Sequence, residues 1–236
     1  MDAVWHTIQN SIYINLIYED RYMFLLKGFG LTLYMTLATF LLGTVLGAVF
    51  CRIRLSKSRA AAKTIELISN LFIRLPSLVL LLIFVYLLFS NTKIDTVILA
   101  IFAFSMKASA YIAVIMYSAV TAINPGEIEA GLTLGMSKWK VFRLITLPQA
   151  INYALPTYKN QLIITLQETS LVGFLAINDL TRASQVITSR TMDPYISIII
   201  TAVAYLLIGV FSNLLFKLFE RNKHLQIELD YKVEEV

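Results

Sequence analysis

Long apolar runs are the feature that most constrains the fold of this chain. Predominantly apolar segments of more than twenty residues lie at about 23–50, 64–90, 94–122, 156–177 and 194–219. A helix that spans a bilayer needs about 20 such residues. Hydrophobic residues make up 58% of the sequence and charged residues only 15%. The pattern predicts an all-α, polytopic membrane protein with about five transmembrane helices.

Basic residues set the expected orientation of these helices. Residues 52–63 carry arginine and lysine with no acidic counterweight, and basic residues follow the last apolar run at Lys217, Arg221 and Lys223. Cytoplasmic loops are enriched in such residues. With five spans, both clusters are cytoplasmic only if the N-terminus is outside and the C-terminus inside. The net charge of +5 is explained in this way, and we expect no nucleic-acid partner.

Three segments are expected along the chain. Residues 1–20 have mixed composition, and an amphipathic helix at the membrane interface and a loosely ordered tail both remain open. Residues 21–222 form one transmembrane domain, and residues 223–236 a charged cytoplasmic tail. The first twenty residues lack a basic start followed by a short apolar core, so we expect no cleavable signal peptide and insertion through the first span. The chain is predicted to be a multi-pass protein of a cytoplasmic membrane.

Polar and breaking residues interrupt the spans at specific places. Pro76, after Arg74 and Leu75, should kink the second span or start its better-packed half. Lys107 lies near the middle of the third span, where a buried lysine costs roughly 2.5–3.5 kcal/mol without a partner. Glu168 lies in the fourth span, the most polar of the five, which should face the bundle interior. A structural Lys107–Glu168 ion pair and a polar path lined by one or both residues remain open.

The longest polar interruption is residues 124–150, NPGEIEAGLTLGMSKWKVFRLITLPQA. Asn124 is placed to cap a short helix, with Glu127 three residues later as in a capping box. Gly135 is placed to end that helix in a left-handed conformation. Ser137 is placed to cap a second amphipathic helix that Leu147-Pro148 closes. Such a helix suits either a soluble partner or the lipid headgroups.

Several kinds of chemistry are not supported by the residues present. Gly126 and Gly131 are spaced like the glycines of a phosphate-binding loop, but Leu132 and Thr133 replace the lysine and hydroxyl residue that follow them there. The two histidines lie at opposite ends of the sequence, and there is one cysteine. We therefore expect no metal site, no catalytic constellation and no cofactor on this chain. The chain cannot use ATP itself, so ATP-driven transport would need a partner that hydrolyses it.

The loop resembles the EAA loop of permease subunits of ATP-binding cassette (ABC) importers. Glu129-Ala130-Gly131, three residues, Gly135, nine residues, and then Ile145-x-Leu147-Pro148 match the pattern E-A-A, three residues, G, nine residues, I-x-L-P. Gly131 replaces the second alanine. The resemblance extends over about residues 26–220. Within the family, the chain is similar to the permeases of histidine/arginine/glutamine-type importers. The further matching segments are Lys27-Gly28, Thr32-Leu33, Pro148-Gln149-Ala150, Ala154-Leu155-Pro156, Asn160-Gln161 and Glu168-Thr169-Ser170-Leu171.

Two departures from the family pattern are visible. In the A-Y-x-x-E region around Ala110-Tyr111, Val114 replaces the acidic residue and Tyr117 the arginine that often follows. Arg74-Leu75-Pro76 shortens the pattern R-G-T-P. Lys107, four residues before Tyr111, places a positive charge in this region that a substrate carboxylate or Glu168 could balance.

The resemblance implies a type I ABC importer permease fold and a set of partners. These are a dimer of cytoplasmic ATP-binding subunits, a second identical or homologous permease subunit, an external or periplasmic substrate-binding protein, and the lipid of a prokaryotic inner membrane. The implied coupling residues are Glu127, Glu129, Ala130, Gly131, Gly135 and Lys138. The candidates for the substrate path are Lys107, Tyr111, Asn160, Glu168 and Thr169.

Two alternatives of other classes remain at this point. A membrane scaffold would use the loop to hold a cytoplasmic partner without transport. An ion-coupled secondary transporter would usually show internal repeats and more spans, and no repeat is visible. The sequence does not name the amino acid or decide between a homodimer and a heterodimer.

Overall fold

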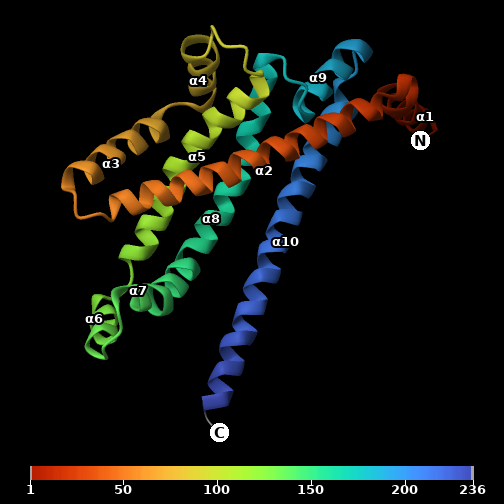
Figure 1. Cartoon of the computed structure of the whole chain (residues 1–236). Coiled ribbons are helices and arrows are strands. Elements are labelled where there is room, and N and C mark those ends of the chain that lie inside the picture. The colour runs from red at the N-terminus through yellow and green to blue at the C-terminus, as the bar shows by residue number, and fades with distance from the viewer. Residues whose placement is uncertain (1, 235–236) are drawn as a thin grey trace. The chain divides into compact units, whose positions relative to one another are not determined.

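The computed structural model describes residues 2–234, and the side chains of residues 5, 6 and 9–217. Every element in this part of the chain is helical (Figure 1). The α-helices are α1 (Asp2–Ile12), α2 (Arg21–Arg54), α3 (Arg59–Arg74), α4 (Ser77–Leu82), α5 (Thr96–Thr121), α6 (Pro125–Thr133), α7 (Lys138–Val141), α8 (Leu147–Thr169), α9 (Leu180–Thr191) and α10 (Pro194–Glu234). Shorter π and 3₁₀ turns are η1 (Tyr13–Ile17), η2 (Tyr18–Asp20), η3 (Ile83–Leu88), η4 (Phe142–Thr146) and η5 (Ser170–Leu175).

The chain forms two compact units. The larger comprises Leu26–Ala183, and the smaller comprises Met1–Leu25 with Ser184–Val236. The predicted division at residues 20 and 222 does not coincide with these boundaries. In the smaller unit, α10 continues as helix to Glu234, well past the predicted end of the fifth span at residue 219. The predicted basic end of the fifth span at Arg221 and Lys223, and the predicted charged tail, lie outside the described side chains.

Helix α5 is the central helix of the larger unit. It begins at an N-cap, Asp95, whose carboxylate accepts a hydrogen bond from the Val97 N–H. Its buried side chains include many small residues, which allow other helices to approach closely. Gly43 and Gly47 of α2 use this property: a Cβ on Gly43 would lie 2.8 Å from Cβ of Ala108. The G-x-x-x-G pair therefore packs on α5.

A sharp break separates α3 from α4, where the sequence predicted a kink. The two helical segments, Arg59–Arg74 and Ser77–Leu88, meet at 107°. Leu75 and Pro76 have extended backbone conformations, as expected for proline and the residue before it. Past the break, Leu81 and Phe84 enter a core cluster with Met35 of α2 and Phe104 of α5. The break thus turns the apolar face of α4 into the core.

Among the residues described, three helical segments are long and apolar enough to cross a membrane: Gln9–Arg54, Thr96–Thr121 and Pro194–Lys217. The bent α3–α4 pair adds a fourth if it is counted as one span. Helix α8 has 23 residues but does not join them. This criterion therefore counts fewer spans than the expected five, because the polar residues of α8 that predicted an interior position also lower its apolarity.

The start of α8 differs from the prediction. Leu147-Pro148 does not close the second loop helix, because the backbone continues helically from α7 through the π turn η4 into α8. Pro148 is accommodated in the first turn of α8, where a missing N–H costs little. The helix begins at Leu147, before the predicted start at residue 156, and Pro156 lies inside it. It ends at Thr169 in the 3₁₀ turn η5 rather than at residue 177.

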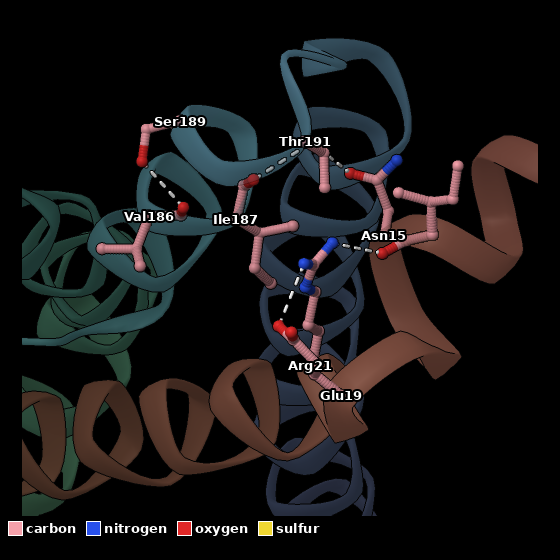
Figure 2. A network of polar contacts seen from close by, with 8 residues as sticks. Asn15, Glu19, Arg21, Val186, Ile187, Ser189 and Thr191 are labelled. Atoms are coloured by element: carbon pink, nitrogen blue, oxygen red, sulfur yellow. Dashed lines mark hydrogen bonds and ion pairs between the residues drawn. The ribbon is translucent and has the colours of Figure 1, made fainter.

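The smaller unit contains a polar network around Asn15 (Figure 2). The Asn15 side chain is fully buried and donates to the carbonyl of Ser11 and to Oδ2 of Asp193. Its Oδ1 accepts from the Thr191 hydroxyl at 3.2 Å. In the same unit, Arg21 donates to the carbonyl of Ile14 at 2.7 Å. These bonds tie the segment after α1 to the end of α9 and the start of α10.

Candidate functional site

The first loop helix, α6, has the ends that its sequence predicted. Oδ1 of Asn124 accepts a hydrogen bond from the Gly126 N–H at 2.9 Å. Gly135 has a φ of +80°, and its N–H donates to the carbonyl of Leu132. The Met136 N–H donates to the carbonyl of Gly131. These two bonds form a Schellman motif, so the cap and the glycine stop are confirmed.

Glu127 does not complete the predicted capping box with its side chain. The Glu127 carboxylate instead accepts a hydrogen bond from Nε2 of Gln149, near the start of α8. Ser137 does cap α7, because its hydroxyl accepts from the Lys140 N–H at 3.3 Å. Side-chain bonds therefore cap the start of each loop helix, and the Glu127–Gln149 bond joins α6 to α8.

Gly131 faces the second half of the loop. It is buried, and a Cβ at this position would lie 2.7 Å from Cδ1 of Ile145 and 3.1 Å from Cγ2 of Val141. Ile128 packs at the base of α6 on Ile123 and Ala150, which belong to the ends of the neighbouring spans. Gly131 thus serves the internal packing of the loop, and the exposed surface of the loop lies elsewhere on α6 and α7.

That surface is made of exposed side chains of both signs and of large apolar groups. Glu129, Ala130 and Lys138 are exposed. Leu134 is 79% exposed and Trp139 is 67% exposed, and the Trp139 ring stacks on Phe142 with centroids 5.8 Å apart. Figure 1 shows α6 and α7 toward the end of α5 opposite to α4. The loop is thus a capped pair of short helices with an exposed surface of charged and large apolar side chains.

Lys107 and Glu168 come together at the break between α3 and α4. The Lys107 ammonium donates to the Leu75 carbonyl at 2.8 Å and to Oγ of Ser77 at 2.7 Å. Ser77 in turn donates to Oε1 of Glu168, which lies 3.5 Å from Nζ of Lys107. The side chains of Lys107 and Glu168 are only 7% and 12% exposed. The ion pair that the sequence left open is therefore formed, with Ser77 between its members.

These contacts explain how the spans hold two buried charges. The Lys107 ammonium, from α5, lies at the C-terminal end of α3 and bonds the Leu75 carbonyl, which the helix leaves without an intrahelical partner. A positive charge is favourable at this end of a helix. Three partners surround Nζ and offset much of the cost of burying it. The group joins four segments, since Leu75 and Ser77 flank the break and Lys107 and Glu168 lie on α5 and α8. It fixes the 107° bend to the two central helices.

The other predicted path residues occupy different positions. Thr169 is fully buried, and its hydroxyl donates to the carbonyl of Leu166. Tyr111 is half-buried one turn after Lys107, and Asn160 is exposed. The structure thus unites Lys107 and Glu168 but gives Asn160 an outward position. Its neighbour Gln161 is the buried amide, at 2% exposure.

Sequence reasoning missed Ser77 and did not single out Gln161. Ser77 follows Pro76 at a helix start, which is the only local signal for it. Gln161 lies seven residues before Glu168 and therefore on the same face of α8. Among the side chains described, Nε2 of Gln161 and Oε2 of Glu168 are buried without a hydrogen-bond partner. The inner face of α8 thus offers unused donors and acceptors.

Comparison with known proteins identifies the family to which this fold and loop belong. Residues 39–224 match the family model described as "Binding-protein-dependent transport system inner membrane component". A probable amino-acid ABC transporter permease, YckA of Bacillus subtilis, is 31% identical over 84% of this chain and 90% of its own length. The histidine/lysine/arginine/ornithine transport system permease HisM of Salmonella typhimurium is 30% identical over 88% of this chain and 92% of its own.

Solved structures agree on the fold. A chain from the crystal structure of an amino acid ABC transporter with histidines has a TM-score of 0.79 and 27% identity, covering 87% of this chain and 97% of that one. A chain of the inward-facing MetNI methionine ABC transporter has a TM-score of 0.72 at 20% identity and covers 85% of this chain and 96% of its own, and at that identity it supports the fold alone. The chain belongs to the family of inner-membrane components of binding-protein-dependent transport systems, and it is a multi-pass permease subunit of the ABC importer type.

Proposed function

We propose that this chain forms one half of the translocation path of an ATP-driven amino-acid importer. The similarity to the amino-acid permeases YckA and HisM supports the substrate class. The observation that carries the coupling role is the loop of α6 and α7, whose helix ends are fixed internally while Glu129, Leu134 and Trp139 stay exposed. This surface docks on a cytoplasmic ATP-binding subunit.

The coupling follows from the rigidity of the loop. The hydrophobic cluster of Ile123, Ile128 and Ala150 joins α6 to the end of α5 and the start of α8. A displacement of the loop by the ATPase is therefore passed directly to both helices. They carry Lys107 and Glu168, so the polar face of α8 moves with the loop. ATP is hydrolysed on the partner, and this chain supplies no ATPase site and needs no cofactor.

The assembly follows from the same family membership. Two permease subunits, identical or homologous, enclose the path, two ATP-binding subunits lie on the cytoplasmic side, and an external binding protein delivers the amino acid. The basic residues 52–63 and Lys138, Lys140 and Arg143 of the loop support a cytoplasmic position for both segments. The N-terminus lies outside and the C-terminus inside.

Glu129→Lys tests the coupling role. The exposed position tolerates the larger side chain, so the variant should insert normally but lose ATP-driven uptake by at least tenfold and retain less ATPase on co-purification. Ala60→Lys is the matched control, because it adds a lysine to an exposed position of α3 outside the loop and should leave uptake unchanged. Normal uptake and normal ATPase retention in Glu129→Lys would refute the assignment of this surface.

A further inference from the structure

The Lys107 ammonium is held by groups of the protein itself. A lysine ammonium carries three N–H donors. Two of them bond the Leu75 carbonyl and the Ser77 hydroxyl, and the third side of the group faces Oε1 of Glu168 at 3.5 Å. Two hydrogen bonds and the ion pair therefore hold Lys107 as a positive charge beside Glu168.

Glu168 is occupied on one oxygen only. Oε1 receives the Ser77 hydroxyl and faces Lys107, whereas Oε2 is buried and has no hydrogen-bond partner among the described residues. A buried carboxylate oxygen without a donor costs roughly 1–3 kcal/mol or more, so this atom is available to an N–H group that enters beside α8. Nε2 of Gln161 is the second unused polar atom on this face.

The charge balance decides which N–H group is favoured. A lone carboxylate in a poorly solvated site would attract any cation strongly. With Lys107 at 3.5 Å, the pair has zero net charge, and an approaching cation gains attraction to Glu168 but meets repulsion from Lys107. An amino acid with zero net charge meets a smaller electrostatic penalty because its own carboxylate balances its α-ammonium group. It can still donate one hydrogen bond to Oε2.

We propose that Lys107 is a specificity-determining residue, which neutralises Glu168 on the inner face of α8 and thereby favours amino acids of zero net charge over those with cationic side chains. The inference rests on the proposed amino-acid path through this chain.

The test is equilibrium binding to the permease–ATPase complex in nanodiscs without the binding protein, so that the selectivity of that protein does not enter. Each of the twenty common amino acids, radiolabelled, is the probe, with unlabelled glutamine and arginine as competitors. The wild-type complex should bind uncharged amino acids, and arginine should compete at least tenfold more weakly than glutamine. In Lys107→Met, the apparent affinity for arginine relative to glutamine should rise at least tenfold.

Two variants separate charge from structure. Ser77→Ala removes the bridging hydroxyl but keeps both charges, so it should lower the thermal midpoint while leaving the arginine-to-glutamine ratio unchanged. Lys107→Arg keeps the positive charge and should also leave the ratio unchanged. A Lys107→Met complex that binds every amino acid more weakly with an unchanged ratio would show a purely structural lysine and overturn the proposal.

The proposed function fails in a different way. If no amino acid binds the wild-type complex and none is taken up by ATP hydrolysis in the complete transporter, the amino-acid path itself is wrong and the specificity role falls with it. If the wild-type complex binds arginine and glutamine equally well, the amino-acid path stands and only the role of Lys107 is overturned.

Discussion

Gly131 lies directly against Ile145 within the loop of residues 124–150: a Cβ on the glycine would be 2.7 Å from Cδ1 of the isoleucine. The family pattern that the loop resembles carries alanine at the position of Gly131. In this chain the distance between α6 and the π turn η4 is too short for an alanine at position 131 while Ile145 keeps its present position. The atom that an alanine Cβ would meet is Cδ1 of Ile145, at the end of a flexible side chain. This side chain can therefore move to accommodate an alanine.

A double-mutant cycle tests this contact. Gly131→Ala alone should destabilise the loop by about 1 kcal/mol, because overpacking outweighs the gain in helix propensity. Ile145→Val deletes the clashing methyl group and alone should cost about 0.5–1.5 kcal/mol. The double variant should lose less stability than the sum of the two single variants. Its thermal midpoint should therefore fall by less than the two single falls added together. Strictly additive midpoints would show that the two positions do not touch.

The left-handed backbone at Gly135 predicts a second ranking of variants. A non-glycine residue at a φ of +80° costs roughly 1–2 kcal/mol, and losing the conformation would break the Schellman motif. Gly135→Ala and Gly135→Asp should therefore lower the thermal midpoint and ATP-driven uptake. Gly135→Asn is the matched control, because asparagine tolerates this region better than other residues. Equal activity of the alanine and asparagine variants would contradict the role of the turn.

The sequence specified the loop ends well because their signals are local. Asn124, Gly135 and Ser137 act on backbone groups two to four residues away, and each has the predicted role. Leu147-Pro148 was misread as the end of a helix, because a proline in the first turn after a π turn is compatible with continuous helix. The proline pattern alone does not distinguish these two cases.

The contacts at the α3–α4 break were less accessible to sequence reasoning. Lys107 and Glu168 were predicted to need partners because a buried charge is costly. Ser77 was missed, because only the 107° bend brings it to these two residues. Along the chain it is 30 residues from Lys107 and 91 residues from Glu168. Local patterns specify helix ends and bends, whereas the angle of a bend depends on packing among distant segments.

Two glycines near the start of α2 give a matched pair of substitutions. A Cβ on Gly28 would lie 2.8 Å from the carbonyl oxygen of Asp179 and 3.0 Å from Cα of Leu180, whereas a Cβ on Gly30 would meet nothing within 4 Å. Gly28→Ala should therefore cost about 1–3 kcal/mol, because backbone atoms must move. Gly30→Ala should be neutral or stabilise the helix by up to about 1 kcal/mol.

The thermal midpoint of the purified complex measures this difference. A cost of 1 kcal/mol lowers the midpoint by roughly 2–4 °C for a soluble domain of 150–250 residues, and the two variants should differ in sign or by several degrees. If Gly28→Ala is as stable as Gly30→Ala, α2 does not approach the start of α9 as closely as these distances require.

The buried amide of Asn15 supports the last prediction. Its Nδ2 donates to Ser11 and to the Asp193 carboxylate at 3.0 Å, so Asn15→Asp would replace a donor by a second carboxylate oxygen. The variant should lose roughly 2–4 kcal/mol through like-charge repulsion and an unpaired buried group. Hydrogen exchange of residues 184–193 should accelerate, because the bond to Thr191 sits in the same network (Figure 2).

The reciprocal variant gives this prediction its control. Asn15→Asp combined with Asp193→Asn exchanges donor and acceptor, so an amide at position 193 can donate to the new carboxylate. In the unmodified protein the Tyr195 N–H donates to Oδ1 of Asp193 at 3.1 Å. The Oδ1 of an asparagine at position 193 can accept the same bond. The double variant should regain most of the protection and midpoint lost in Asn15→Asp. Hydrogen exchange that stays fast in the double variant would mean that the burial of Asn15, and not its bond to Asp193, holds the end of α9 in place.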